Sequence, residues 1–234
     1  MNSMFFRIVG WPRRWFWLVL AWLSVGAAWA APFQNGSFET GTDPVRFANQ
    51  VTGSTNMTGW TVTSGNVDYI GTYWTAADGT RSVDLNGTGT GRTGTIAQTF
   101  DTVAGHRYVV QFALAGNPDT RAANMTKTMR VQATGSASAD YTFNATGHTL
   151  TAMGWTDQIY AFTATGTSTT LTFASLMDTE YGPVIDNIRV DDVTVTAVDA
   201  TITPVPVPTV STWMLALLSG GILLLGLARR KSQR

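Results

Sequence analysis

Large apolar side chains recur at every second position along several stretches in the middle of this 234-residue chain. The same period of two is found in 108–114, in 129–133 and in 170–173, whereas a helical period of about 3.6 residues never persists for long. Successive side chains of a strand point to opposite faces, so each stretch is predicted to be a strand with one buried face. The clearest case has four such residues: Tyr108, Val110, Phe112 and Leu114.

Turn residues separate the predicted strands. Thr is abundant, and Gly with Asn marks turns at Asn35-Gly36, at Asn86-Gly87 and within 102–105. Two packed antiparallel sheets would let every strand bury one face. We therefore expect an all-β fold, a β-sandwich formed by residues 31–198, which is long enough to bury a hydrophobic core.

Cysteine and charge exclude several kinds of site. The chain has no Cys, so neither disulfides nor thiolate metal sites are available, and stability must come from packing or from a metal held by oxygen ligands. All fifteen acidic residues lie between Glu39 and Asp199, together with eight of the fifteen basic ones, which leaves that part a formal charge of −7. Nucleic acid demands clustered Lys and Arg, so we expect no nucleic-acid partner.

Residues 1–30 are predicted to be a signal peptide. Three arginines precede an apolar stretch from Trp15 to Val25, and Ala28-Trp29-Ala30 has the small-x-small pattern of a signal-peptidase site. The Arg13-Arg14 pair also resembles a twin-arginine signal, but the strongly apolar stretch behind it and the absence of cofactor motifs favour the general secretory route. Cleavage would make Ala31 the first mature residue.

The C-terminal part has three successive segments. A Pro-rich linker with a short motif occupies 199–212, an apolar run occupies 213–228, and a basic tail occupies 229–234. Sixteen helical residues rise roughly 24 Å, against a hydrocarbon core of about 30 Å. The run is therefore marginal as a permanent span, and we expect a transmembrane helix that snorkelling Arg side chains and an interfacial Trp213 extend across the membrane. The basic tail places that end in the cytoplasm and the main domain outside it.

The motif before this run resembles a sorting signal. Val207-Pro208-Thr209-Val210-Ser211-Thr212-Trp213, with the Leu-rich run and terminal arginines, resembles the IPTL-CTERM signals of Gram-negative bacteria. Val207 and Val210 stand where Ile and Leu are usual. The resemblance implies an exosortase-like membrane transpeptidase as partner and a surface location. A simple single-span membrane anchor is the alternative.

Six motifs lie in order between Phe33 and Val195. They are Asn35-Gly36-Ser37-Phe38-Glu39, Gly59-Trp60-Thr61-Val62, Gly65-Asn66-Val67-Asp68-Tyr69-Ile70-Gly71, Asp78-Gly79-Thr80-Arg81-Ser82-Val83-Asp84-Leu85-Asn86-Gly87, Ala115-Gly116-Asn117-Pro118 and Gly182-Pro183-Val184-Ile185-Asp186-Asn187. Together they resemble the choice-of-anchor C family, which is similar to a domain-of-unknown-function group also found in plant cell-wall proteins. The resemblance implies a galactose-binding-like jelly-roll β-sandwich, a fold common among carbohydrate-binding modules. It implies no particular ligand.

Asp186 is a candidate metal ligand. Alternation predicts that it shares a face with Val184, Ile188 and Val190. A buried carboxylate needs a cation or several hydrogen-bond donors. Galactose-binding-like modules often carry a structural Ca²⁺ where the first and last strands meet, and the resemblance implies Ser37, Glu39 and Asp186 as its ligands here. The alternative is that Asp186 caps backbone amides or faces solvent.

A sugar site needs aromatic faces for stacking, surrounded by groups that bond to hydroxyls. The candidates lie in or beside predicted loops: Tyr73, Trp74, Arg81, Asp84 and Asn117. Each has a structural alternative, and Asp68 and Asp84 would then pair with arginines such as Arg81. Trp60 and Trp155 follow Gly at strand starts, which favours a place in the core.

Catalytic and nucleotide motifs find little support. His106 and His148 have no Ser or metal-ligand partner at a diagnostic spacing. The sequence of 89–94 matches a dinucleotide fingerprint, but a predicted strand, 95–100, follows it instead of a helix, so we expect a hairpin loop.

The leading hypothesis is a non-catalytic surface protein that binds polysaccharide of the envelope or extracellular matrix. The alternatives are a structural surface protein without glycan affinity and, third, a glycosidase.

Overall fold

The computed structural model describes residues 31–119, 121 and 124–194. These residues form eleven strands, and the predicted strands at 108–114, 129–133 and 170–173 fall inside three of them. In chain order the strands are β1 (Phe47–Val51), β2 (Thr61–Ser64), β3 (Asn66–Ile70), β4 (Ser82–Asp84), β5 (Thr95–Asp101), β6 (Arg107–Gly116), β7 (Thr126–Ala133), β8 (Ala139–Asn144), β9 (Thr156–Thr163), β10 (Ser168–Ser175) and β11 (Pro183–Asp192).

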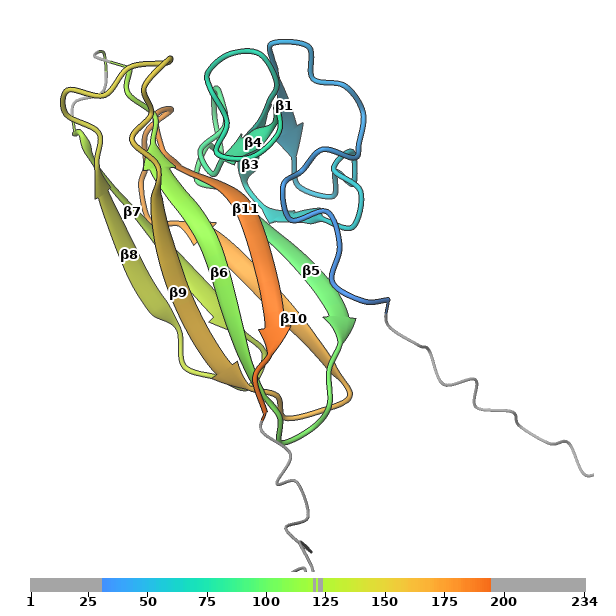
Figure 1. The fold of residues 1–234 in the computed structure, drawn as a ribbon. Coiled ribbons are helices and arrows are strands. Elements are labelled where there is room, and N and C mark those ends of the chain that lie inside the picture. The colour runs from blue at the N-terminus through green and yellow to red at the C-terminus, as the bar shows by residue number, and fades with distance from the viewer. Residues whose placement is uncertain (1–30, 120, 122–123, 195–234) are drawn as a thin grey trace, which may run out of the picture. The chain divides into compact units, whose positions relative to one another are not determined.

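The strands pack as two sheets, which confirms the predicted β-sandwich (Figure 1). One sheet has six strands in the order β1-β3-β4-β11-β6-β9, and the other has five in the order β2-β5-β10-β7-β8. Neighbouring strands in both sheets run antiparallel. The short strands β1, β3 and β4 lie with their loops at one end of the longer strands (Figure 1). This end carries the candidate site.

Aromatic side chains fill the space between the sheets. Phe173 of β10 lies edge-on to Phe112 of β6, with ring centroids 5.3 Å apart. It also contacts Trp60, whose ring centroid is 6.0 Å away. The Trp60 indole N–H donates to the backbone oxygen of Asn35 at 3.0 Å, so its polar atom is satisfied inside the core. The expectation that Trp60 is a core residue is confirmed, since it is only 1% exposed.

A β-bulge in β11 breaks the alternation that was expected around Asp186. The pairing of β11 with β6 shifts register between Asp186 and Arg189, and Asn187 has a φ of 50°. Before the bulge, Asp186 pairs with Ala113, and after it Val190 pairs with Val110, a core residue. Asp186 and Val190 therefore point to opposite faces, and the prediction that they share one was wrong.

In the described part of the chain, no helix is long and apolar enough to cross a membrane. The predicted signal peptide, sorting motif, transmembrane segment and basic tail fall in 1–30 and 195–234. All of these lie outside the described residues.

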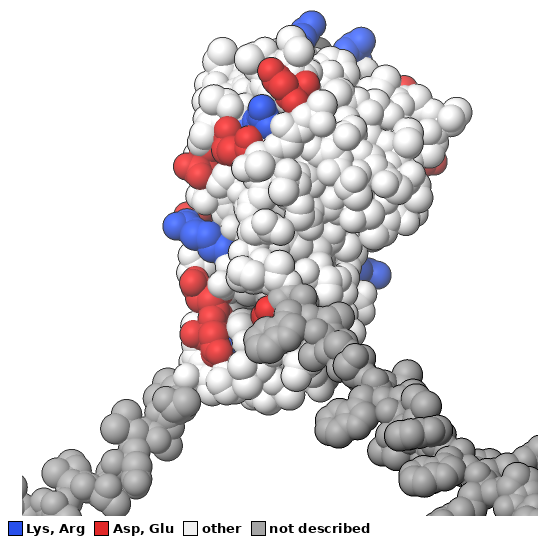
Figure 2. All heavy atoms as spheres, turned by 90° about the vertical axis from the view of Figure 1, so that its right-hand side faces the viewer, with Lys and Arg blue, Asp and Glu red and all other residues white. Residues whose placement is uncertain are grey.

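Charged side chains are sparse on the face of the domain in Figure 2. Uncharged residues cover most of that face, and acidic and basic side chains are interspersed toward one side of it. The broad basic surface that a nucleic-acid partner demands is not seen on this face.

Candidate functional site

The candidate site is a pocket on the outer face of the six-stranded sheet. Strand alternation creates it, because Val67 and Val83 point into the core while their neighbours Asp68 and Asp84 point the other way. These two aspartates are direct partners across β3 and β4. They form the floor of a pocket with a volume of about 170 Å³.

Loops from distant parts of the sequence build the pocket walls. Three of these loops follow β3, β4 and β6, and a fourth precedes β11. Residues more than one hundred positions apart in the sequence therefore line one cavity. The lining residues are Phe47, Asp68, Ile70, Tyr73, Trp74, Asp84, Thr88, Asn117, Arg121, Glu180 and Tyr181.

Aromatic rings form two sides of the pocket. The ring of Tyr73 lies 5.3 Å from that of Phe47 and 5.2 Å from that of Trp74, measured between centroids. Phe47 is 40% exposed, whereas Trp74 is 6% exposed and its indole N–H donates to Ser82 Oγ at 2.8 Å. The guanidinium of Arg46 also lies over the Tyr73 ring, 4.5 Å from its centroid. Trp74 is therefore a buried support, and the ring surface open to a ligand comes from Phe47 and from the part of Tyr73 that Arg46 does not cover.

Tyr181 belongs to the loop before β11. The guanidinium of Arg121 lies over its ring, 5.4 Å from the centroid. Arg121 also forms an ion pair with Asp119, with Nη2 and Oδ2 2.6 Å apart. The arginine charge at the pocket is therefore already paired with a carboxylate of the same loop.

Asp84 is the buried anchor of the pocket floor. Its carboxylate accepts hydrogen bonds from Asn117 Nδ2 at 2.9 Å, from the backbone N–H of Asn86 at 2.9 Å and from that of Gly182 at 3.2 Å. Burial raises the pKa of Asp84 to about 8, although the bonds from Asn117 and Asn86 oppose this shift. Asp84 thus ties three loops to β4, and its burial favours the protonated form.

Asp68 lies beside Asp84 and is held differently. Its carboxylate accepts from Asn49 Nδ2 at 2.9 Å and from the hydroxyl of Thr88 at 2.9 Å. Burial also raises the pKa of Asp68, while the bonds from Asn49 and Thr88 work against that rise. The expectation that Asp68 or Asp84 pairs with an arginine is not met, because amide, hydroxyl and backbone donors take that place.

Lys127 is a buried cation near this floor. It belongs to β7, is fully buried, and donates from Nζ to the backbone oxygen of Asn124 at 2.7 Å. Burial lowers its pKa, and the negative charges of Asp84 and Asp119 oppose the shift. The buried positions of β7 are 127, 129, 131 and 133, and all but the first are apolar. A lysine at the first of these positions interrupts the apolar pattern, and this interruption is the sequence signal that could have identified Lys127 as a residue of interest.

The structure brings together four of the five residues predicted for sugar binding: Tyr73, Trp74, Asp84 and Asn117. Arg81 lies elsewhere. Its Nη1 donates to the Tyr69 hydroxyl at 2.8 Å, and its guanidinium is 3.9 Å from the carboxylate of Asp43. Whether the four pocket residues bind a sugar stays a prediction.

The residues predicted for calcium, Ser37, Glu39 and Asp186, all form hydrogen bonds with one loop, 77–81. Asp186 accepts from the backbone N–H groups of Ala77 at 2.8 Å, Asp78 at 2.9 Å and Asn187 at 2.6 Å. Burial raises the pKa of Asp186 to about 7, against these bonds. This is the backbone-capping alternative that the sequence left open for Asp186.

Glu39 and Ser37 complete the contacts with this loop. Glu39 accepts from the backbone N–H groups of Thr80 at 2.8 Å and Arg81 at 2.7 Å, and Ser37 donates to Asp78 at 2.6 Å. Among the described residues, no three His, Cys, Asp or Glu side chains form a group that could hold a metal ion. The donors that occupy both carboxylates do not fit a calcium ion in this arrangement, and calcium at this position stays a prediction.

Several pocket residues were not singled out from the sequence: Phe47, Thr88, Arg121, Glu180 and Tyr181. Phe47 lies in β1, the edge strand of the six-stranded sheet. Glu180 and Tyr181 come directly before the Gly182-Pro183 turn. A polar turn next to a predicted last strand was the available signal for these two.

The fold and the pocket define the class: a two-sheet β-sandwich with an aromatic and acidic pocket on the outer face of one sheet. The chain belongs to the family described as "Protein of unknown function (DUF642)", whose model matches residues 31–191. The predicted likeness to a domain-of-unknown-function family is thereby confirmed.

Comparison with a curated protein and with solved structures gives further similarities. Halomucin of Haloquadratum walsbyi is 34% identical over 178 residues, which cover 71% of this chain and only 2% of that protein's length. The structure of TmCBM61 in complex with beta-1,4-galactotriose has a TM-score of 0.41 at 15% identity, covering 69% of this chain and 98% of that one. The CBM22-1 xylan-binding domain from Paenibacillus barcinonensis Xyn10C has a TM-score of 0.41 at 12% identity, covering 64% and 95%. Likeness at this level assigns no ligand.

Proposed function

We propose that the chain is a non-catalytic glycan-binding protein and that the pocket on the six-stranded sheet holds one neutral sugar unit. The observation that carries this proposal is the combination of accessible aromatic rings with acidic and hydroxyl acceptors in one pocket. Tyr73 and Tyr181 offer ring faces, and Asp68, Thr88 and Glu180 offer oxygens to sugar hydroxyls. The volume of about 170 Å³ is below the range of roughly 300–1,000 Å³ found for drug-sized ligands, which favours a single unit.

The charges of the pocket favour a neutral sugar over an acidic one. Arg121, the basic residue of the described pocket lining, is already paired with Asp119, and Arg46 lies over the Tyr73 ring, 4.5 Å from its centroid, without belonging to that lining. A uronic acid or sulfated sugar would therefore find no unpaired cation among the described lining residues. It would instead meet the carboxylates of Asp68 and Glu180 at close range. Like charges in a partly buried site repel strongly, and acidic glycans should bind least.

Replacing Tyr73 by alanine is expected to weaken binding of the preferred oligosaccharide at least tenfold, about 1.4 kcal/mol, because a stacking surface is lost. The measurement is a screen of neutral and acidic glycans followed by calorimetric titration of the best ligand. Ile159→Ala is the matched control, since Ile159 is 63% exposed on β9 and does not line the pocket. Its affinity should equal that of the unaltered protein.

The same samples separate the other candidate functions. If no glycan binds but the protein associates with itself, a structural surface protein replaces the binding proposal. Asp68 and Asp84 are neighbouring carboxyl groups in the pocket, a pairing that glycosidases also use. Release of shorter sugars from a bound oligosaccharide would therefore favour a hydrolase.

We also infer, from the sequence resemblances, that the protein is an exported member of the choice-of-anchor C family with a galactose-binding-like jelly roll. The small-x-small site at 28–30 supports export, and the motif 207–213 supports sorting by an exosortase-like enzyme. The short apolar run 213–228 and the basic tail support a membrane anchor, either transient or lasting.

The intact mass of the native protein tests this inference. We expect a chain that begins at Ala31 and ends upstream of Trp213, recovered from the cell surface or the medium. A chain that keeps Arg234 and stays in the inner membrane would contradict sorting and favour the simple single-span anchor.

A further inference from the structure

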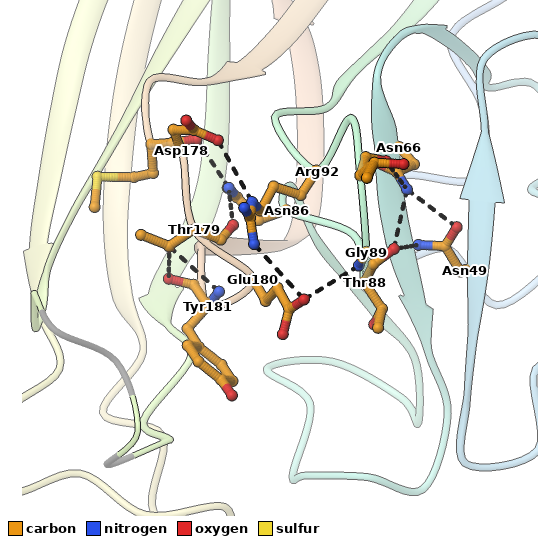
Figure 3. Close-up of polar contacts among 12 residues, drawn as sticks. Asn49, Asn66, Asn86, Thr88, Gly89, Arg92, Asp178, Thr179, Glu180 and Tyr181 are labelled. Atoms are coloured by element: carbon orange, nitrogen blue, oxygen red, sulfur yellow. Dashed lines mark hydrogen bonds and ion pairs between the residues drawn. The ribbon is translucent and has the colours of Figure 1, made fainter.

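The loop between β4 and β5 encloses a buried amide whose oxygen has no partner. Asn66 is 6% exposed, and its Oδ1 has no hydrogen-bond donor within the described part of the chain. Buried polar atoms are nearly always satisfied, so an orphaned acceptor calls for a water or an ion. Figure 3 shows Asn66 facing Asn49 and Thr88.

The nitrogen of the same amide is crowded by oxygens. Asn66 Nδ2 has three acceptors, Thr88 O at 3.2 Å, Thr90 O at 3.3 Å and Asn49 Oδ1 at 3.3 Å. An amide nitrogen carries two N–H groups, so it cannot serve three acceptors well, and all three contacts are long. Thr88 O has a second weak donor, Asn49 Nδ2 at 3.5 Å. Three oxygens thus surround an amide nitrogen that satisfies them poorly, while the oxygen of that amide has no partner in the described residues.

We propose that this loop is a calcium site in which the Asn66 amide is turned over, so that Oδ1 joins the three other oxygens. Exchange of the oxygen and nitrogen of a carboxamide leaves its shape unchanged. Four oxygens then converge: Asn66 Oδ1, Asn49 Oδ1, Thr88 O and Thr90 O. Amide and backbone carbonyl oxygens are ligands that Ca²⁺ prefers, and water completes its shell of six to eight.

Charge and access also favour a cation here. The carboxylate of Asp68 accepts from Asn49 Nδ2 at 2.9 Å, which orients Asn49 with its oxygen toward Asn66. A carboxylate behind a ligating side chain both fixes the ligand and adds negative charge. Thr88 and Thr90 are exposed, so an ion can enter from solvent.

The proposed ion would stiffen one wall of the pocket. Thr88 supplies a ligand oxygen and also lines the pocket, where its hydroxyl bonds to Asp68. The backbone N–H of the next residue, Gly89, donates to Glu180 Oε1 at 3.3 Å, as Figure 3 shows. Arg92 from the same loop lies 3.6 Å from that carboxylate. The calcium site does not depend on glycan binding, and it is separate from Ser37, Glu39 and Asp186.

Calcium titration of the metal-free protein, followed by calorimetry and thermal unfolding, tests the proposal without any sugar. We expect binding of calcium and a rise of several degrees in Tm, because a ligand that binds only the folded state stabilises it. Asn66→Ala should lose this rise. Glu39→Gln should keep it, since Glu39 belongs to the other candidate position.

If Asn66→Ala does not fold, Asn66→Asp provides a second test of whether residue 66 binds calcium. A carboxylate cannot donate to the three oxygens, so this variant should be less stable than the unaltered protein in chelator. Calcium should restore its Tm and bind about tenfold more tightly than to the unaltered protein, because a charged ligand replaces a neutral one. A site filled by water predicts destabilisation without rescue. No calcium binding by the unaltered protein, or binding lost in Glu39→Gln and kept in Asn66→Ala, would overturn the proposal.

Discussion

The free energy of unfolding is expected to fall as the pH rises from about 4 to about 8. Asp84 has a pKa of about 8 in the folded protein and Asp186 one of about 7, against 3.8 for an unperturbed aspartate. Between these values the folded state holds protons that the unfolded state has released, so stability decreases with rising pH. At roughly 1.4 kcal/mol per unit, Asp84 alone accounts for a loss on the order of 5 kcal/mol.

Urea unfolding at several pH values between 4 and 9 measures this loss. Asp84→Asn removes the group with the highest of these pKa values and should flatten the slope, while Asp186 and Asp68, whose pKa values are also raised by burial, account for the slope that remains. Asp140→Asn is the control, because Asp140 lies at the surface, its pKa is lowered by the hydrogen bond from Arg130, and an arginine does not titrate in this pH range. That substitution should leave the slope above pH 4 unchanged. Stability that stays constant or rises between pH 4 and 8 would contradict the burial of both carboxyl groups.

Trp74→Ala is expected to destabilise the protein by about 3–5 kcal/mol, the usual cost of removing a large buried aromatic side chain. Trp74 is 6% exposed, packs against Tyr73 and donates to the buried hydroxyl of Ser82. Its loss would leave both a cavity and an unpaired hydroxyl. Thermal and urea unfolding would report the change directly.

Tyr73→Ala is the companion variant, and it should destabilise far less because Tyr73 is only partly buried. A fall in glycan binding in Trp74→Ala would therefore mix unfolding with loss of a contact, and Tyr73 is the better probe. Equal stability of Trp74→Ala and the unaltered protein would show that Trp74 is not part of the core.

The strands could be read from the sequence because each has one buried face. Tyr108 to Leu114 alternate within β6, and Leu171 with Phe173 alternates within β10, as local rules demand. The prediction failed at β11, where a single residue, Asn187, adopts a positive φ and shifts the phase. A β-bulge depends on the register in which β11 pairs with β6, and the alternation of apolar residues within β11 does not specify that register.

The candidate site was only partly predictable. Tyr73, Trp74, Asp84 and Asn117 were recognised as residue types suited to sugar, and the fold brings them together. Arg81 differs from its neighbours because the 77–81 loop turns it toward Tyr69. Thr88 and Tyr181 enter the pocket through contacts between loops about ninety residues apart, which no local pattern reveals.

The most direct measurement for the proposed function is the change in backbone amide NMR signals when the best oligosaccharide of the screen is added. We predict that the shifts centre on Tyr73, Thr88 and Tyr181, which reach the pocket from three separate loops. Shifts centred on the outer face of the five-stranded sheet, or no shifts with any glycan at millimolar concentration, would contradict the account.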